Sequence, residues 1–317
     1  MEYNELKMLQ ALPLEIKVAK TKLRIREFVD FIGQENVYIA FSGGKDSTVL
    51  AHIVRQEYPN IPLVFSNTGL EYADIQRFVN TFDNVVMLRP KKNFKEVLEE
   101  EGYPIVSKKT ARMVHDLQNP TDRNERSRKL YLSDYCLDKE GNYTERKNNS
   151  FKVANKWRKL IDAPFKVSHK CCDYLKKQPL KSYEKETGKR PIIGTMANES
   201  KMRESTYLQT GCNTMDEIKG SSKPLGFWTE QDVLKYIVDN NVEICKVYGD
   251  ITEENGKYTL SGEQRTGCVY CGFGAHLENG KNRYQRLELI DKNQYNYCIN
   301  ELGFGEVLDF IGVEYKN

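Results

Sequence analysis

Two groups of residues in this sequence could carry out chemistry: a short glycine-rich loop and a set of cysteines. The stretch YIAFSGGKDSTVL, residues 38–50, places two glycines, a lysine and an aspartate directly after an apolar run. A strand that ends in a glycine loop and continues as a helix leaves backbone N–H groups free to bind an anion. Gly43 and Gly44 allow close approach of a ligand, and Lys45 can neutralise its charge. The loop therefore predicts a phosphate site.

The remaining side chains of the loop narrow down the kind of phosphate. Asp46 suits such a site only if Mg²⁺ accompanies the phosphates. The loop is not a Walker A motif, which needs glycine at the position of Ile39 and a serine or threonine in place of Asp46. We expect Lys45 and Asp46 to be catalytic and to face solvent, with a chance turn as the alternative. The hydroxyl groups that could donate to phosphate oxygens are those of Ser42, Ser47 and Thr48.

The cysteines form the second group. Cys171 and Cys172 are adjacent, Cys268 and Cys271 form a C-x-x-C motif, and Cys212 lies between the two pairs. Thiolates in such a pattern could bind Zn²⁺ or an iron–sulfur cluster. Structural zinc and free buried thiols are the alternatives that spacing alone leaves open. The three cysteines without a partner in sequence are expected to act as small buried hydrophobic residues: Cys136, Cys245 and Cys298.

Strands that alternate with helices predict an α/β fold with a parallel sheet flanked by helices. We expect an N-terminal helical arm over residues 1–35 and a nucleotide-binding domain over 36–240, with a basic insertion at about 104–165. Residues 241–317 form a C-terminal region with the C-x-x-C motif and closing helices. A hairpin is predicted within residues 256–267. The expected strands cover residues 37–41, 61–69, 84–90 and 190–195.

Composition and charge limit the classes of function. Apolar residues make up 39% of the 317 residues, and no apolar run approaches the roughly 20 residues of a membrane span. The N-terminus lacks a signal peptide, so we expect a cytoplasmic protein with reduced thiols and no membrane partner. Residues 139–190 hold 15 Lys and Arg against 6 Asp and Glu, a local charge of +9 in a chain of net charge +3. This segment is either a solvated surface or a binding site for a nucleic acid.

Several motifs in order resemble a known family. SGGKDS after the first strand resembles the PP-loop of the ATP pyrophosphatases, the adenine nucleotide alpha-hydrolase superfamily. Further stretches resemble its phosphoadenosine phosphosulfate (PAPS) reductase branch, over roughly residues 36–300: NTGLEYADI, CCDYLKKQPL, GTMANESKMRES, KPLGFWTEQDVLKYI and GCVYCGFG. The resemblance implies a Rossmann-like fold. It also implies an enzyme that cleaves ATP, with Mg²⁺, between the α and β phosphates.

The resemblance also implies roles for individual residues. Residues 42–48 would hold the pyrophosphate, and Asn67, Thr68 and Gly69 would lie beside the adenosine. Glu199, Ser200 and Arg203 would face the nucleotide and substrate, with Arg203 catalytic, whereas Met196 stands where many members carry arginine. The cysteines resemble the ligand set of a 4Fe–4S cluster in the iron–sulfur members. Three positions are firm and the fourth is left open between two: Cys172, Cys268 and Cys271, with Cys171 or Cys212.

Three reactions compete. The first is ATP-dependent adenylation of an acceptor with pyrophosphate release, followed by sulfur transfer with help from the cluster. The second is reduction of adenylyl sulfate or its 3′-phosphate, and the third is a nucleic-acid or nucleotide-binding module with a structural metal. The intact loop and the last residues, GEVLDFIGVEYKN, which lack cysteine and histidine, favour the first. The expected partners are an adenine nucleotide, a sulfur donor or reductant protein, a nucleic-acid acceptor and further copies of this chain.

Overall fold

The structure is a computed structural model that describes residues 2–317. The chain divides into two compact units. Unit 1 comprises residues 2–90 and 176–266, and unit 2 comprises residues 91–175 and 267–317. The divisions expected from sequence, at residues 35/36 and 240/241, differ from these boundaries because each unit is assembled from two separate stretches of chain.

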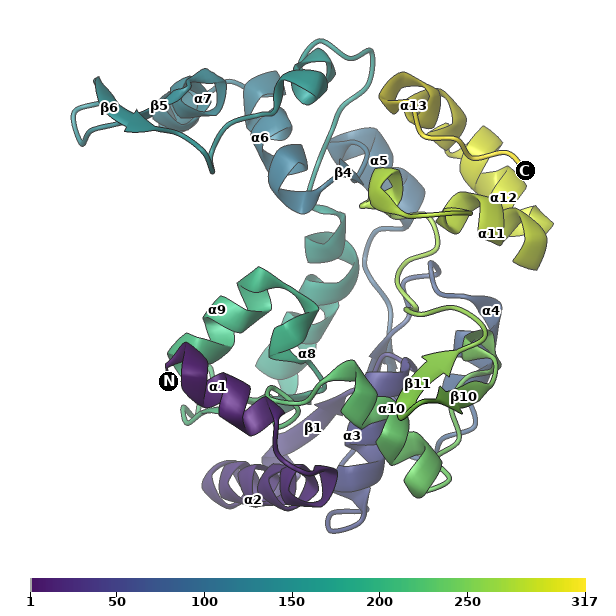
Figure 1. Cartoon of the computed structure of the whole chain (residues 1–317). Helices are drawn as coiled ribbons and strands as arrows, with labels where there is room; N and C mark the ends of the chain where they lie inside the picture. Colours follow the sequence, from purple (N-terminus) through teal and green to yellow (C-terminus); the bar gives the residue numbers. More distant parts are fainter. Residues whose placement is uncertain (1) are drawn as a thin grey trace. The chain divides into compact units, whose positions relative to one another are not determined.

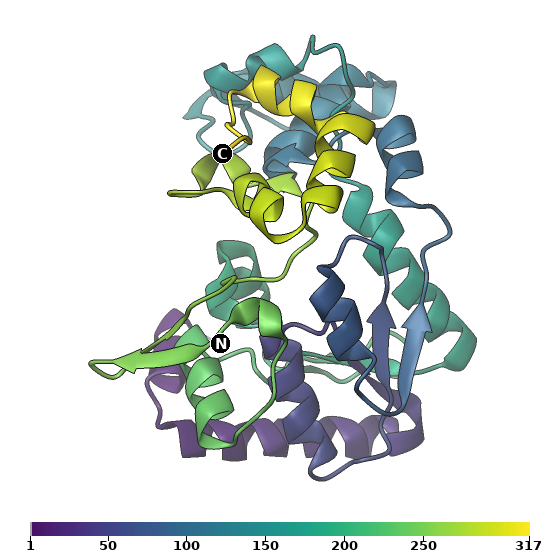
Figure 2. The same cartoon turned by 90° about the vertical axis from the view of Figure 1, so that its right-hand side faces the viewer.

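A six-stranded sheet forms the centre of unit 1, with the strand order β3-β2-β1-β7-β9-β8. All neighbouring strands are parallel except β8 and β9, which pair antiparallel. Figure 2 shows two parallel strands of this sheet side by side. This arrangement confirms the predicted α/β fold. The strands span Val37–Ala40 (β1), Leu63–Ser66 (β2), Val85–Leu88 (β3), Arg190–Ile193 (β7), Asn213–Thr214 (β8) and Ser221–Ser222 (β9).

The sheet is buried because helices cover it. Successive residues of a strand point to opposite faces. Tyr38 of β1 points to α8, where its hydroxyl donates to Glu184 (2.8 Å) and its ring meets Tyr183 edge-on. Val37 and Ile39 point to the opposite face and are fully buried. The remaining long elements of unit 1 are α1 (Tyr3–Gln10), α2 (Leu14–Ile32), α3 (Lys45–Arg55), α4 (Ala73–Val79), α8 (Gln178–Thr187), α9 (Lys201–Thr210) and α10 (Glu230–Asp239).

The N-terminal helix α2 lies beside α3 (Figure 1), and buried polar contacts join it to the rest of unit 1. Lys17 is only 2% exposed and pairs with Asp232 at the start of α10 (2.6 Å). The Trp228 indole donates to the Thr21 hydroxyl (2.8 Å), which in turn donates to the carbonyl of Pro224 (3.2 Å). The predicted helical arm is therefore an integral part of unit 1.

Unit 2 consists mainly of helices, with two small sheets. Its strands β4 and β12 pair in parallel, although more than 160 residues separate them in sequence. The helices are α5 (Phe94–Glu101), α6 (Lys108–Gln118), α7 (Glu125–Leu132), α11 (Arg283–Ile290), α12 (Lys292–Asn296) and α13 (Phe304–Ile311). The strands are β4 (Ile105–Val106), β5 (Tyr135–Leu137), β6 (Tyr143–Lys147) and β12 (Gly272–Phe273). None of the helices over residues 2–317 is long and apolar enough to cross a membrane.

One hairpin was predicted too late in the chain. It is formed by β10 (Ile251–Glu254) and β11 (Lys257–Leu260), so residues 261–267 lie outside it. The turn is at Asn255 and Gly256, both with positive φ (53° and 75°). Two positive φ angles suit the tight turn that twisted antiparallel strands favour, and Asn-Gly is its commonest sequence. The Asn-Gly pair was the signal for this hairpin.

The buried hydroxyl of Thr21 gives a stability prediction. Thr21→Val keeps the shape of the side chain but leaves the Trp228 N–H and the Pro224 carbonyl without their partner. We expect a loss of about 1–3 kcal/mol in the free energy of unfolding. Urea unfolding followed by Trp228 fluorescence, in a Trp157→Phe background, measures it. Thr206→Val on the exposed side of α9 is the control. An equal stability of the two variants would contradict the prediction.

Candidate functional site

The glycine loop connects β1 to α3, with Gly44 as the residue that caps the helix. Gly43 has a φ of +69°, and a Cβ placed on it would lie 2.8 Å from a methyl carbon of Val79 and 2.9 Å from one of Ile75. Only glycine fits this conformation and this space. The loop is therefore held tightly against α4, and its shape is fixed before any ligand binds.

The hydroxyl groups of the loop are used to shape it. Ser47 and Thr48 are buried and donate to the carbonyl of Gly44 (2.9 and 3.1 Å). Ser42 is exposed, accepts from the Gly44 N–H (3.3 Å) and shares a hydrogen bond with Ser47 (3.0 Å). Of the three hydroxyl groups predicted to bind phosphate, that of Ser42 is thus the accessible one.

Lys45 is buried rather than solvent-facing, which corrects the expectation from sequence. Its side chain is 3% exposed, and its ammonium contacts Glu230 (3.2 Å), Asp46 (3.6 Å) and the carbonyl of Gln264 (3.2 Å). Burial of an ammonium is costly without such partners, so two acids and a carbonyl surround it. The charge of Lys45 is therefore held in place at the first residue of α3.

The backbone of Lys45 is held by a pair of hydroxyl groups. Its N–H donates to the Tyr248 hydroxyl (3.0 Å), which shares a hydrogen bond with Thr266 (2.7 Å). Burial raises the pKa of Tyr248 to about 12, so this hydroxyl keeps its proton. Both hydroxyl groups lie 3.1 Å from where a Cβ of Gly44 would be. They therefore close one side of the loop.

Asp46 carries an unused acceptor. Its Oδ1 atom is buried without a hydrogen-bond partner, and Lys45 is its neighbour at 3.6 Å. Burial raises the pKa of Asp46, and the charge of Lys45 opposes this shift. The backbone beside it is crowded, because a Cβ on Gly194 would lie 3.0 Å from the Asp46 carbonyl oxygen. A carboxylate oxygen that accepts no hydrogen bond is the type of ligand that Mg²⁺ takes, so this atom fits a metal that accompanies a nucleotide.

The residues predicted to lie beside adenosine form a turn after β2. Gly69 has a φ of +73°, and its N–H donates to the Asn67 side chain (3.1 Å). The Thr68 hydroxyl donates to Glu71 (2.8 Å), which also accepts from the Thr68 N–H (3.2 Å). Glu71 was not singled out from sequence. It holds the turn from a buried position.

Arg203 lies within electrostatic reach of the loop. Burial lowers its pKa, Arg265 lowers it further and Asp46 opposes both. Glu199 pairs with Arg203 and also accepts from the Met196 N–H (2.9 Å). Ser200 caps α9 by accepting from the Arg203 N–H (3.3 Å). Unit 1 thus brings Arg203 and the loop lysine and aspartate into one charged region.

Sequence reasoning missed five residues of this region. Tyr248 and Glu230 gave no signal, because a single tyrosine or glutamate in a loop or at a helix start is common. The other three lie in a stretch that was predicted as part of a hairpin, although it leads directly into the C-x-x-C motif: Gln264, Arg265 and Thr266.

Four of the five candidate metal-binding cysteines lie in unit 2. The sulfur atoms of Cys171 and Cys172 are 4.0 Å apart. The hydrogen bond with Cys172 is the main cause that raises the pKa of Cys171, followed by burial and by the thiols of Cys271 and Cys268. The other three thiols are therefore within electrostatic reach of Cys171. Across residues 2–317, no three His, Cys, Asp or Glu side chains are already arranged as ligands of a single metal ion.

Cys212 belongs to unit 1. It lies between α9 and β8, where its sulfur meets the Tyr207 hydroxyl (3.4 Å) and burial raises its pKa. Cys245 and Cys298 are buried, in agreement with their expected role as hydrophobic residues, whereas Cys136 is half-buried on β5.

A half-buried arginine supports the C-x-x-C motif. The Cys271 N–H donates to the Cys268 carbonyl (3.1 Å), and Arg283 donates to the Cys271 carbonyl (2.8 Å). Glu278 accepts from the Arg283 guanidinium (2.7 Å from Nε) and from its backbone N–H (2.7 Å). Burial lowers the pKa of Arg283, but the Cys271 thiol and Glu278 raise it by more. A fixed positive charge beside Cys271 favours its thiolate form.

Comparison with known proteins identifies the family. Residues 36–131 and 91–271 match the phosphoadenosine phosphosulfate reductase domain, and together they cover most of the chain. The chain belongs to this family.

Individual relatives are distant. An uncharacterized protein of Methanocaldococcus jannaschii is 30% identical over 126 residues, which are 37% of this chain and 30% of that protein. The chain thus spans about a third of the length of this relative. A phosphoadenylyl-sulfate (PAPS) reductase from Candida auris, in a phosphate complex, is 13% identical (TM-score 0.41, 81% of this chain and 98% of that chain). The U34-tRNA thiolase NcsA from Methanococcus maripaludis, with its [4Fe-4S] cluster, is 14% identical (TM-score 0.38, 92% and 78%).

The Asp46 carboxylate, whose Oδ1 atom accepts no hydrogen bond, predicts a conflict between stability and function. Asp46→Asn removes a half-buried negative charge together with its long ion pair to Lys45, and we expect the thermal midpoint at pH 7 to rise by about 2–4 °C. Burial raises the pKa of Asp46 in the folded state. The charged carboxylate therefore destabilises the fold fully at pH values above the folded-state pKa, and not at all at pH values below the unfolded-state pKa. The gain should therefore shrink as the pH falls toward the ordinary value of 3.8.

Differential scanning fluorimetry across pH measures this effect, with Asp239→Asn on the exposed side of α10 as the control. A lower midpoint for Asp46→Asn at pH 7 would show that the charge stabilises the loop, and would contradict the prediction.

Proposed function

We propose that this protein adenylates an acceptor with ATP, releases pyrophosphate, and supports transfer of sulfur to the activated acceptor. The observation that carries the proposal is the preformed loop between β1 and α3. Gly43 is held at positive φ, the Lys45 ammonium is fixed at the start of the helix, and the Asp46 Oδ1 atom accepts no hydrogen bond. These are the groups that a chelated polyphosphate requires.

The first step breaks the bond between the α-phosphorus of ATP and the oxygen that bridges to the β-phosphate. An acceptor oxygen attacks the α-phosphorus, and the pyrophosphate leaves with the electron pair of the broken bond. Lys45 and the helix N-terminus stabilise the charge that develops on this leaving group. Mg²⁺ bound with ATP would be held by Asp46 and would neutralise part of the same charge. We assign to Arg203 a contact with the α-phosphate, because its charge is within electrostatic reach of Asp46 in the loop.

The second step replaces AMP. A sulfur nucleophile attacks the adenylated carbon of the acceptor, a C–S bond forms, and AMP leaves with the electron pair of the C–O bond. No net oxidation or reduction is needed for this exchange when the donor supplies sulfur at the level of hydrosulfide. The sulfur donor protein would provide that atom.

The thiols of unit 2 fit an iron–sulfur cluster. Cys172, Cys268 and Cys271 are within electrostatic reach of Cys171, and Arg283 favours thiolate at Cys271. Four thiols in one unit supply the four ligands that such a cluster needs. When bound, such a group supplies a site that can hold sulfur. Only Gly267 separates Thr266, which contacts Tyr248 beside the loop, from Cys268 in the sequence.

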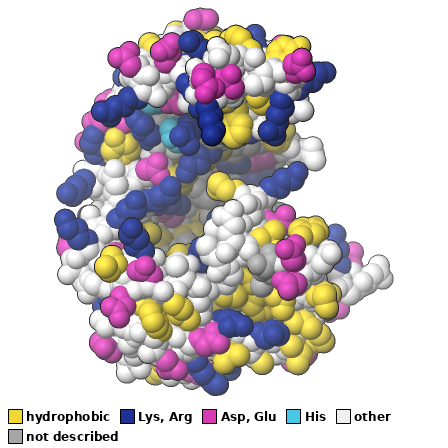
Figure 3. Space-filling view, turned by 90° about the vertical axis from the view of Figure 1, so that its left-hand side faces the viewer, with side chains coloured by type: hydrophobic (Ala, Val, Ile, Leu, Met, Phe, Trp, Pro, Cys, Tyr) yellow, Lys and Arg dark blue, Asp and Glu magenta, His cyan; other side chains and the backbone are white. Residues whose placement is uncertain are grey.

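A nucleic acid is the acceptor that we favour. Lys and Arg side chains are frequent on the face that Figure 3 shows. Within the basic segment 139–190, Arg158 and Lys159 donate to backbone carbonyls (3.0 and 2.6 Å), which gives them a structural role. Three exposed cations of the β5–β6 hairpin do not have this structural role: Lys139, Arg146 and Lys147. These three side chains are the better candidates for contacts with phosphates.

ATP/pyrophosphate exchange in anaerobically purified protein tests the reaction. Exchange should require an acceptor, and Lys45→Ala should lower its rate by about 10²–10³-fold because the leaving group loses its cation. Three samples are tested separately as sources of the acceptor: mixed tRNA, duplex DNA and a small-metabolite extract. Lys235→Ala on the exposed side of α10 is the control. Parental exchange in Lys45→Ala, or reduction of adenylyl sulfate without any exchange, would contradict the proposal.

The same preparations separate the classes of acceptor. If a nucleic acid binds, its affinity falls as salt is added. Changing Lys139, Arg146 and Lys147 to Gln should make the plot of log affinity against log salt less steep, by about 2–3 in the size of the slope. If the acceptor is a small molecule, the three substitutions should change neither its affinity for the protein nor the shallow salt dependence of that affinity.

Iron analysis of single cysteine variants tests the ligand set. The parent should contain about four irons per chain. Cys171→Ser should lose most of the iron, whereas Cys212→Ser should keep it, since Cys212 is held by Tyr207 in unit 1. One zinc per chain without iron would support a structural metal instead. Loss of iron in Cys212→Ser alone would reassign the fourth ligand.

A further inference from the structure

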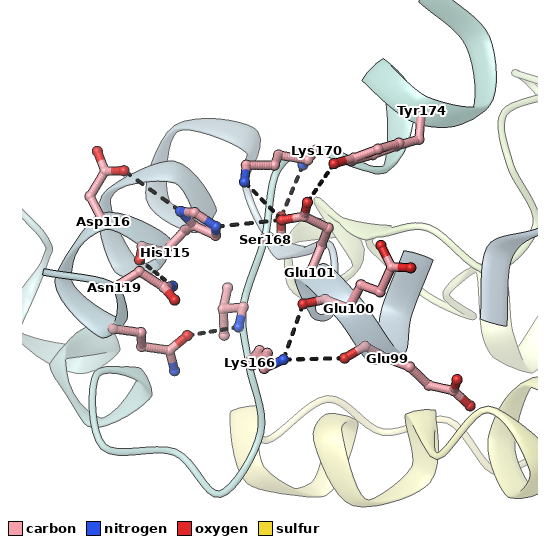
Figure 4. A network of polar contacts seen from close by, with 12 residues as sticks. Glu99, Glu100, Glu101, His115, Asp116, Asn119, Lys166, Ser168, Lys170 and Tyr174 are labelled. Atoms are coloured by element: carbon pink, nitrogen blue, oxygen red, sulfur yellow. Dashed lines mark hydrogen bonds and ion pairs between the residues drawn. The ribbon is translucent and has the colours of Figure 1, made fainter. Parts of the chain in front are cut away.

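The vicinal cysteines lie in a short stretch whose two ends share one acceptor. Glu101, the last residue of α5, accepts from the Lys170 ammonium (2.8 Å) and from the Tyr174 hydroxyl (2.6 Å). Lys170 directly precedes Cys171, and Tyr174 comes two residues after Cys172. Figure 4 shows the Lys170 and Tyr174 side chains both reaching the Glu101 carboxylate, which is 13% exposed.

Adjacent cysteines need such a constraint to act together. Neighbouring residues of a regular helix point about 100° apart, because each turn holds 3.6 residues. Here the turn after Cys172 is wound as a π-helix, Asp173–Lys177, and both the Asp173 and Tyr174 N–H groups donate to the Lys170 carbonyl (2.8 and 3.2 Å). Wide turns of this kind are frequent at functional sites. The sulfur atoms end 4.0 Å apart.

The backbone of Glu101 is itself fixed against the chain that leads to the cysteines. Gly102 follows it with a φ of +111°, and a Cβ there would lie 2.4 Å from the carbonyl of Lys166. The Tyr103 N–H donates to that carbonyl (2.9 Å), and the Ser168 N–H donates to the Tyr103 carbonyl (3.0 Å). The Lys166 ammonium donates to the carbonyl of Glu100 (3.1 Å) (Figure 4). The residue that carries the accepting carboxylate, Glu101, is therefore rigidly placed.

The surroundings keep the Glu101 carboxylate charged. Burial acts to raise its pKa, but hydrogen bonds from Lys170 and Tyr174 outweigh it, so the pKa is lowered. The His115 imidazole lies 3.7 Å away on α6. A charged acceptor makes stronger hydrogen bonds than a neutral one.

We propose that Glu101 is a positioning residue of the thiol site: by binding Lys170 and Tyr174 together, it holds Cys171 and Cys172 so that both sulfur atoms face one bound group. This inference rests on the proposed cluster ligation. Residues that orient metal ligands from the next shell affect metal affinity by 10–100-fold in general.

Glu101→Gln in the full chain tests the inference, since Gln keeps the size but loses the charge and one acceptor oxygen. We expect iron release to a chelator to accelerate at least tenfold over the parent. Glu100→Gln is the matched control, because Glu100 is the preceding residue of α5 and its carboxylate pairs with Lys92 instead. Tyr174→Phe removes only one of the two hydrogen bonds, and we expect an intermediate rate. Parental release rates in both Glu101→Gln and Tyr174→Phe would overturn the inference.

A second measurement does not depend on iron. In metal-free protein, iodoacetamide labelling read by peptide mass spectrometry gives separate rates for Cys171 and Cys172. Glu101→Gln and Tyr174→Phe should change the ratio of the two rates at least threefold, whereas Glu100→Gln should not. A parent without iron, combined with a changed ratio, would refute the cluster and keep the positioning role. An unchanged ratio in both variants would refute the positioning role itself.

Discussion

A buried ammonium is the constraint on which the phosphate loop depends. Lys45 begins α3 with almost no access to solvent, and its charge must be met inside the protein. Glu230, the carbonyl of Gln264 and the neighbouring Asp46 meet it, and Tyr248 holds the N–H of the same residue. Residues 230–266 are therefore as necessary to the loop as the strand and helix that flank it. A change in these distant residues would alter the loop without touching its motif.

This constraint also shows what the sequence could and could not predict. The apolar runs before Ser42 and around Val64 predicted parallel strands correctly, because each run is short and bounded by turn residues. The loop between β1 and α3 was also found where it was expected. The exposure of Lys45 was predicted wrongly, since the motif says nothing about Glu230 or Gln264, which come from far along the chain. Long-range partners of this kind leave no local pattern.

The thiols give a similar lesson. Their spacing in sequence left Cys171 and Cys212 equivalent as fourth candidates. The structure places four of the five thiols in unit 2, whereas Cys212 contacts Tyr207 in unit 1. The spacing of apolar residues along the sequence does not predict how the chain divides into these two units. Unit 2 combines two stretches that periodicity reads as an insertion and a C-terminal region, and β4 finds its only strand partner in β12 among residues 2–317.

The late pairing of β4 with β12 bears on how the chain is made. Synthesis adds about 5–20 residues per second, and domains generally fold as units while they emerge. Residues 105–106 leave the ribosome more than 160 residues before their partners, and Cys172 precedes Cys268 by 96 residues. The first half of unit 2 must therefore wait, with an open strand edge and two thiols, until residues 267–317 have been translated. The order in which the ribosome produces the two halves thus sets the earliest moment at which the four thiols of unit 2 can come together.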